Sequence, residues 1–344
     1  MWEYCAGRAA GREGACGGTT LSRPGAPSID GMAYRFFTPP PARQATGPAA
    51  EVHRQLREDF IGPAPTFQSL AVAPDLMAAT WALMREALLA GDADRVEREV
   101  VAASVSRANR CRFCVDAHVT MLHALGSHDL AEVIASGGTP SSPRHAELAT
   151  WAEASRNPRA TAWASAYPAE LTGTLLAFHF INRIVSALLT PDLLPGGLQR
   201  FPAVRSAGGR LYARTARAFV EPGEGSVAEA YATLREVALG GGDMLSEVAR
   251  ETVAATVRWE DGRHPDRPAD WANDLVRDLP AADRVGARIV LLAAFAPGAI
   301  SAGDVGLWRL THPDDADLVR LIGYGAITAT NHVAAPLTGE YRHA

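Results

Sequence analysis

Apolar residues recur at helical spacing along most of this chain, and no segment alternates apolar and polar residues as a half-buried strand does. The pattern is strongest in the segments 74–89, 93–108, 114–125, 171–189 and 226–239. Without strand segments, no βαβ unit can be assembled from the sequence. The sequence therefore predicts an all-α fold, in which helix packing supplies the whole core.

The N-terminal part is expected to lie outside this core. Residues 1–31 mix Gly, Ala and Arg without the contiguous apolar stretch of a secretory signal peptide, and they can equally be an artefact of start-site choice ahead of Met32. The stretch 39–50 is rich in Pro, Gly and Ala, and helical patterning begins at Glu51. We therefore expect a disordered or extended arm over residues 1–50.

An internal repeat favours two helical units after the arm. EVVAASVSRANRC, from Glu99, matches ETVAATVRWEDGR, from Glu251, and INRIVSALL matches TNHVAAPLT at a similar offset, with Asn182 opposite Asn331. Chance similarity between helices rich in Ala and Val is the alternative. The agreement in order and offset favours a tandem duplication, with units at residues 51–200 and 201–344.

The bulk composition excludes several kinds of partner. A formal net charge of −5 and the lack of a Lys/Arg-rich run argue against nucleic-acid binding. The most apolar run, residues 289–300, is interrupted by Pro297 and Gly298 and is too short to cross a bilayer, so we expect no membrane partner. Only four cysteines occur, of which Cys5 and Cys16 are expected to be incidental; such sparse use suits a reducing compartment, and we expect a cytoplasmic protein.

One segment carries candidate redox chemistry. SRANRCRFCVDAHVTML contains Cys111, Cys114 and His118 in the pattern C-x-x-C-x-x-x-H. On a helix that starts near Cys111, the two sulfurs are one turn apart and the histidine lies one turn beyond the second cysteine, on the same face. A helix N-terminus, an imidazole and the nearby Arg110 and Arg112 all favour a thiolate, which is the reactive form of cysteine.

Other uses of these residues remain possible at this point. The first alternative is that the two cysteines are buried and purely structural. The second is a structural zinc site. Zinc takes a fourth ligand, and since no second C-x-x-C exists, His123 or Glu99 would have to supply it. Covalent haem is excluded because Val115, and not His, follows the second cysteine. Glu99 itself lies on a segment that is otherwise apolar, and its spacing fits either an ordinary helix-face charge or a functional carboxylate.

The four residues together carry a resemblance. The pattern E-x11-C-x-x-C-x-x-x-H, filled by Glu99, Cys111, Cys114 and His118, resembles the active-site motif of the alkylhydroperoxidase D-like and carboxymuconolactone decarboxylase family. The resemblance is strong over residues 92–126 and extends weakly through FHFINRIVSALL. It implies an all-α helical bundle, a homo-oligomer, and peroxide reduction in which Cys114 attacks, Cys111 resolves, and His118 with Glu99 relays protons.

Helix geometry supports the same assignment of the two cysteines. His118 follows Cys114 by four residues, one turn away, whereas Cys111 is nearly two turns from the imidazole. We expect Cys111 to lie nearer the incoming loop and solvent, where it can resolve a sulfenate and meet an external reductant.

The expected function is therefore a thiol-dependent peroxidase that acts on hydroperoxides without a cofactor or metal. Its disulfide would be reduced by an external dithiol, and the resemblance suggests a lipoyl-bearing or thioredoxin-like protein. The alternatives are a non-enzymatic redox sensor, a zinc-stabilised assembly module, and a lactone decarboxylase like a related branch of the family that lacks the cysteine pair.

The second unit is expected to be a catalytically silent scaffold. Under the repeat alignment the positions of the two cysteines and the histidine are taken by Arg263, Asp266 and Asp270, whereas Glu251 keeps the acid position. Polar residues elsewhere carry structural predictions: the trio of His179, Asn182 and Arg183, on an apolar helix, favours a buried hydrogen-bond network or a subunit contact. THPDDAD, from Thr311, favours a helix N-terminus rather than a metal site.

Overall fold

The computed structural model describes residues 34–62, 64–159 and 167–338. Within these ranges the regular structure is helical, and the only β-type pairings are the isolated bridges of Tyr34 with Leu189 and Ala90 with Val220. The all-α prediction is confirmed. Cys5, Cys16 and the segment 1–31 lie outside the described residues.

The helices follow the predicted periodicity closely. The first part of the chain forms η1 (Ala42–Gln44), α1 (Gly47–Asp59), α2 (Pro65–Leu70), α3 (Pro74–Met84), η2 (Arg85–Leu89), α4 (Arg95–Ala108), α5 (Arg112–Leu125), α6 (His128–Ser136), α7 (Pro143–Ala154) and α8 (Ala169–Leu188). The second part forms η3 (Pro195–Arg200), α9 (Pro202–Ala216), α10 (Val227–Leu239), η4 (Gly240–Met244), α11 (Glu247–Glu260), α12 (Pro268–Val276), α13 (Ala281–Phe295), η5 (Pro297–Ala299), α14 (Ala302–Trp308) and α15 (Asp315–Thr338). The expected helix 74–89 is divided, because its last turn, η2, is a π-helix.

Local chemistry accounts for several helix ends. Proline stands in the first turn of α1, α2, α3, α7, α9 and α12, where its missing N–H costs no intrahelical bond. The Asp94 side chain caps α4 by accepting from the backbone N–H of Val96 at 2.7 Å. Gly126 ends α5 in the left-handed conformation, with φ of 92°.

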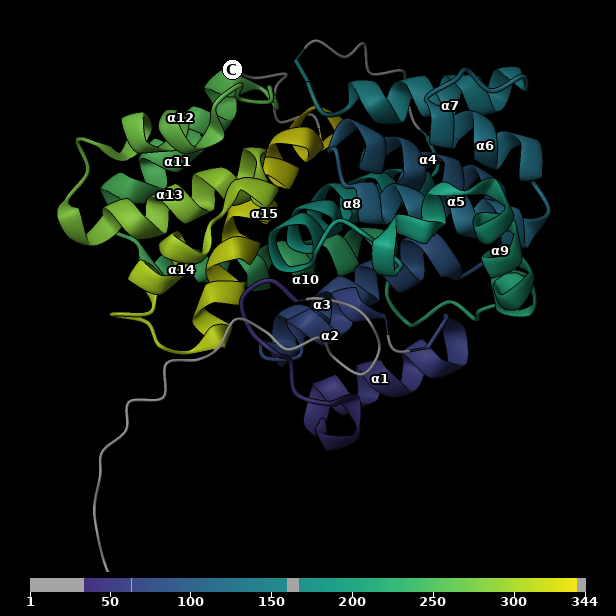
Figure 1. The fold of residues 1–344 in the computed structure, drawn as a ribbon, viewed down its shortest axis with the longest axis horizontal. Coiled ribbons are helices and arrows are strands. Elements are labelled where there is room, and N and C mark those ends of the chain that lie inside the picture. Colours follow the sequence, from purple (N-terminus) through teal and green to yellow (C-terminus); the bar gives the residue numbers. More distant parts are fainter. Residues whose placement is uncertain (1–33, 63, 160–166, 339–344) are drawn as a thin grey trace, which may run out of the picture.

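Helix α8 lies at the centre of the molecule, between the group α4–α7 with α9 and the group α11–α14, and α15 packs along it (Figure 1). By length and composition, α8 is the one described helix apolar enough to cross a membrane. Its most apolar window is 89% buried inside the protein, which is the environment of a core helix.

Both predicted units contribute to one continuous core. The largest cluster of buried apolar side chains includes residues from α3 to α8 and from α10 to α15. Helices α4 and α11 contain the matched Glu99 and Glu251, but Glu99 has no exposed surface whereas Glu251 is exposed. The α9 helix, placed by sequence in the second unit, packs against α5 of the first. The tandem duplication and its boundary stay predictions.

The described part of the N-terminal arm is fixed to the body. Helix α1 begins at Gly47, four residues before the expected start, because Pro48 suits a first helical turn. The Arg35 guanidinium donates to the carbonyl oxygens of Ala187 at 2.8 Å and Gly298 at 3.1 Å, among others. It therefore joins the end of α8 to the segment after α13.

The polar trio on α8 forms the predicted buried network. The His179 Nδ1 accepts from Asn109 Nδ2 at 3.3 Å, and its Nε2 lies 2.7 Å from the Ser155 hydroxyl. Arg183 Nε donates to the carbonyl oxygen of Ala294 at 2.8 Å. Burial, followed by the charges of Arg183 and Arg156, lowers the pKa of His179 well below its usual value, so the imidazole is neutral in the folded protein.

This neutral histidine predicts a loss of stability on acidification. The unfolded chain takes up a proton on His179 near pH ~6.5 and the folded chain does not, so stability is full above that pH and falls below it. At pH 5 the loss in the free energy of unfolding that His179 causes is at most about 2 kcal/mol. We expect the His179→Gln variant to lose less melting temperature between pH 7 and pH 5 than the unsubstituted protein. An equal loss of melting temperature in the variant and the unsubstituted protein would contradict this account.

Candidate active site

The turn between α4 and α5 places the two cysteines. Asn109 caps α4, Arg110 adopts the left-handed conformation with φ of 56°, and the N–H of Cys111 donates to the carbonyl oxygen of Ser106 at 2.9 Å. This closure reverses the chain within a few residues. Cys111 then becomes the residue that precedes the first turn of α5.

Cys111 and Cys114 are joined as a disulfide, with 5.4 Å between their Cα atoms. The spacing predicted from the helix therefore brings the two sulfurs into reach of each other. Both side chains are buried, with 2% of Cys111 and 4% of Cys114 exposed. The expectation that Cys111 lies nearer solvent is wrong, because the residues after α8 and after α13 enclose it.

Glu99 lies on α4 with no exposed surface. Its Oε2 is 2.6 Å from His118 Nδ1, and its Oε1 accepts from Arg95 Nε at 2.9 Å. Burial raises the pKa of this carboxyl, but the charges of Arg95 and His118 and their hydrogen bonds lower it more, so the net pKa lies below the usual value. Of the two readings left open by the sequence, the solvated helix-face charge is wrong.

His118 is oriented by two neighbours. Its Nδ1 is engaged with Glu99, and its ring meets the Phe178 ring edge-on at 4.3 Å between centroids. With Nδ1 occupied, Nε2 is the ring nitrogen available for proton transfer. His118 and Cys114 line the same cavity, one helical turn apart.

That cavity has a volume of about 530 Å³ and mostly apolar walls. They come from α2, α3, α5, α8 and α9 and from the residues next to these helices: Phe60, Ile61, Phe67, Met84, Phe113, Met121, Phe178, Ile181, Leu193, Leu194, Val204, Leu211 and Tyr212. Helix α9 approaches α5 closely at Gly209, where an added Cβ would stand 2.6 Å from the Cβ of His123. The close approach lets α9 cover the Cys114 side of the site.

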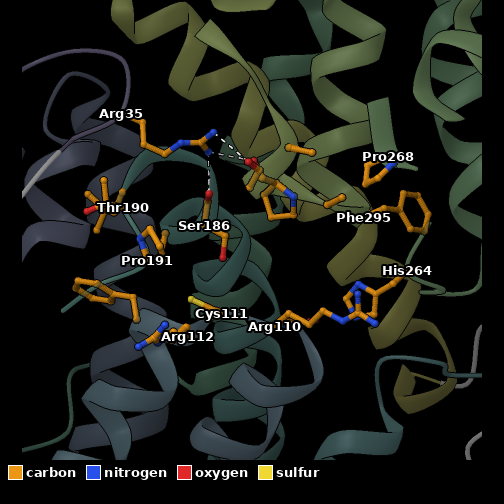
Figure 2. Close-up of a pocket in the computed structure, with 18 of the residues that line it drawn as sticks. Arg35, Arg110, Cys111, Arg112, Ser186, Thr190, Pro191, His264, Pro268 and Phe295 are labelled. Atoms are coloured by element: carbon orange, nitrogen blue, oxygen red, sulfur yellow. Dashed lines mark hydrogen bonds between the residues drawn. The ribbon is translucent and has the colours of Figure 1, made fainter. Parts of the chain in front are cut away.

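Cys111 borders a different cavity, of about 400 Å³. Figure 2 shows its sulfur between Arg110 and Arg112, with Arg35 across the space and His264 to one side. The walls include the end of α8 and the segment 295–299 that follows α13. The two sulfurs of one disulfide thus face two separate cavities.

The zinc alternative finds little support in this geometry. Glu99 is held by His118 and Arg95, and His123 bonds instead to His128 at 2.9 Å and Glu132 at 2.8 Å. In the described ranges of the chain, no three His, Cys, Asp or Glu side chains are grouped to hold a metal ion.

Sequence reasoning missed several residues of the site. Arg95 precedes Glu99 by four residues, and that spacing was a usable signal for an ion pair on one helix face. Phe178, the walls from α9, and the approach of Arg35 and His264 to Cys111 depend on contacts between distant segments, for which the sequence holds no local signal.

Comparison with known proteins identifies the family of this chain. The model of the carboxymuconolactone decarboxylase family matches residues 74–167, which include all four predicted site residues. A curated protein of Mycobacterium tuberculosis, named an alkyl hydroperoxide reductase, is 32% identical over 314 residues, which are 85% of this chain and 91% of that protein. The chain therefore belongs to the alkylhydroperoxidase D-like and carboxymuconolactone decarboxylase family.

The contrast between Glu99 and Glu251 yields a stability prediction. Glu99→Ala leaves His118 and Arg95 without their buried partner, and we expect a loss of roughly 3–5 kcal/mol in the free energy of unfolding. Glu251→Ala removes an exposed side chain and should change that energy by less than about 0.5 kcal/mol. Urea unfolding of both variants at neutral pH measures the difference. Equal losses would mean that the Glu99 ion pair adds nothing to the fold.

Proposed function

We propose that this protein is a thiol-dependent peroxidase that reduces organic hydroperoxides through Cys114 and Cys111. The observation that carries the proposal is the shared cavity of Cys114 and His118, in which the imidazole is held by a fully buried carboxylate and the second cysteine is within disulfide reach. The name of the mycobacterial relative, an alkyl hydroperoxide reductase, supports the same reaction class.

In the first step the Cys114 thiolate attacks the terminal oxygen of the hydroperoxide. The O–O bond breaks, an oxygen is transferred to sulfur, and the alkoxide leaves as an alcohol after taking up a proton. Cys114 stands in the first turn of α5, where the helix N-terminus stabilises a thiolate. His118 Nε2 accepts the thiol proton and returns it to the alkoxide, while Glu99 and Arg95 hold the ring in place.

In the second step Cys111 condenses with the sulfenic acid. Its sulfur attacks the sulfur of Cys114, the S–O bond breaks, and water leaves. The product is the disulfide present in this structure. An external dithiol, lipoyl-bearing or thioredoxin-like, then returns both cysteines to thiols and leaves as a disulfide. No cofactor or metal is required.

The apolar walls of the Cys114 cavity favour a hydroperoxide with an alkyl or aryl group over hydrogen peroxide, because the organic part loses contact with water on binding. Lactone decarboxylation, the reaction of a related branch, needs no cysteine pair, so the disulfide favours the peroxidase. A redox sensor would use the same disulfide without turnover. The reducing environment that such thiol chemistry needs fits a place in the cytoplasm.

The division of labour between the cysteines is tested by intact mass. In a background with Cys5→Ser and Cys16→Ser, a reduced Cys111→Ser variant should consume about one equivalent of cumene hydroperoxide and gain one oxygen as a trappable sulfenic acid. The matched Cys114→Ser variant should gain none. An added oxygen on Cys114→Ser alone would reverse the assignment. If the protein that retains both Cys111 and Cys114 shows no steady turnover of the hydroperoxide, the peroxidase proposal is rejected.

We also propose that the protein is a homo-oligomer. Several large apolar side chains of η3, α9 and the segment after it are exposed: Leu198, Phe201, Leu211 and Phe219. Light scattering at micromolar concentration should give a mass at least twice that of the chain. A monomer across that range would reject the proposal.

A further inference from the structure

The cavity at Cys111 is lined by cationic groups and lacks acidic ones. The guanidinium groups of Arg35, Arg110 and Arg112 contribute to its walls, and no Asp or Glu is among its described lining residues (Figure 2). Its remaining walls are mostly proline, aliphatic and aromatic side chains. The cavity around Cys111 therefore differs in charge from the apolar cavity around Cys114.

Little of this charge is compensated by carboxylates. Arg112 has Asp192 at 3.6 Å and Asp116 at 3.9 Å, which are long contacts for ion pairs. Arg110 is exposed, and within the described part of the chain no carboxylate lies within 4.0 Å of it. The Arg35 guanidinium donates its hydrogen bonds to backbone carbonyl oxygens.

Two further arginines stand directly behind the wall. Arg156 and Arg183 are buried and donate to Asn109 Oδ1 and to the carbonyls of Ala294 and Phe295, and the described residues provide no carboxylate for either. The Nε of Arg156, a side chain 5% exposed, has no hydrogen-bond partner among those residues. A buried cation that lacks a counter-ion raises the local positive potential.

The neighbouring His264 adds no charge to this cavity. Burial and the charge of Arg156 lower the pKa of His264 to about 4, against a weaker opposite effect from its hydrogen bond to the carbonyl of Ala108. Its ring is therefore neutral at pH 7, and the positive charge of the cavity resides on the arginines.

We propose that this cavity binds the reductant, and that the reductant is a small dithiol with a carboxylate or similar anionic group. This inference rests on the proposed function, since it names the partner that resets the disulfide. Cys111 lines a space of about 400 Å³, and only 2% of the residue is exposed. A slender dithiol can reach it, whereas the surface sulfur of a globular thioredoxin-like protein cannot without movement of the walls.

The exchange proceeds through Cys111. A thiolate of the reductant attacks the Cys111 sulfur, the bond to Cys114 breaks, and Cys114 leaves as a thiolate beside His118. The second thiol of the reductant then attacks the reductant's sulfur atom in the mixed disulfide, and Cys111 leaves as a thiolate. The reductant is oxidised to a disulfide, and the two cysteines gain the two electrons and two protons that it loses.

The inference also gives the second unit a role. Residues 264–268 and 295–299 belong to the half without cysteines, and they form one side of the Cys111 cavity. That half supplies no nucleophile but shapes the space in which the reductant meets the disulfide.

Two donors that differ in one charge test the proposal. Dihydrolipoate carries a carboxylate, and dihydrolipoamide is the same dithiol with a neutral amide. The oxidised full-length protein is mixed with each donor, without any peroxide. Stopped flow follows the near-ultraviolet absorbance of the cyclic disulfide that each donor forms as it is oxidised. We expect dihydrolipoate to react at least about threefold faster at low salt, and the ratio to fall towards one at ~0.5 M salt.

Variants of one arginine supply the control. Arg110→Gln should lower the preference for the carboxylate and Arg110→Glu should lower it further, whereas Arg235→Gln should keep the unsubstituted ratio, because Arg235 is an exposed residue of α10 outside both cavities. A second donor pair, dihydrolipoyl-lysine in an acidic or a neutral peptide, shows whether the anionic group belongs to the dithiol or to its carrier. Equal rates for both small donors, or a ratio unaffected at Arg110, would overturn the inference even if peroxide turnover is normal.

Discussion

The hydrogen bond between Glu99 and His118 is the interaction on which the rest of the site depends. A carboxylate with no exposed surface is costly unless hydrogen bonds compensate it, and here Arg95 and His118 provide them from the two helices that flank the redox turn. The same contact joins α4 to α5 and leaves Nε2 as the free nitrogen of an imidazole that lines the cavity of Cys114. Fold stability and the proposed proton transfer thus share one interaction.

Local patterns in the sequence predicted the helices and the side chains that share one helix face. Helical spacing located α4, α5, α8 and α10 to within about two residues, and the i, i+4 relation of Cys114 and His118 put both on one face. Burial was not predictable in the same way. The exposure of Cys111 depends on segments far along the chain that fold over it, so reasoning from its place in the first turn of a helix gave the wrong result.

The two matched acids show why a repeat in sequence is no guide to shared chemistry. Glu99 and Glu251 occupy equivalent places in α4 and α11, but one is enclosed by a histidine and an arginine and the other faces outward. Once the partner residues of a buried carboxylate are lost, keeping it buried would cost several kcal/mol, so the position is stable only at the surface. The C-terminal part of the chain instead contributes walls: α9 over the Cys114 cavity, and residues 264–268 and 295–299 beside Cys111.

Separate access to the two sulfurs has a chemical consequence. A peroxidatic thiolate that shared its cavity with a dithiol would face competition between substrate and reductant for the same space, whereas here an apolar cavity serves one sulfur and a cationic cavity serves the other. The disulfide lies between them, since Cys111 precedes the first turn of α5 and Cys114 completes it. Under the proposed function, the hydroperoxide then reaches the pair from one side and the reductant from the other. Because the disulfide spans one helical turn, each of its sulfurs lies in a cavity of different polarity. Each cavity can therefore be selective for its own ligand.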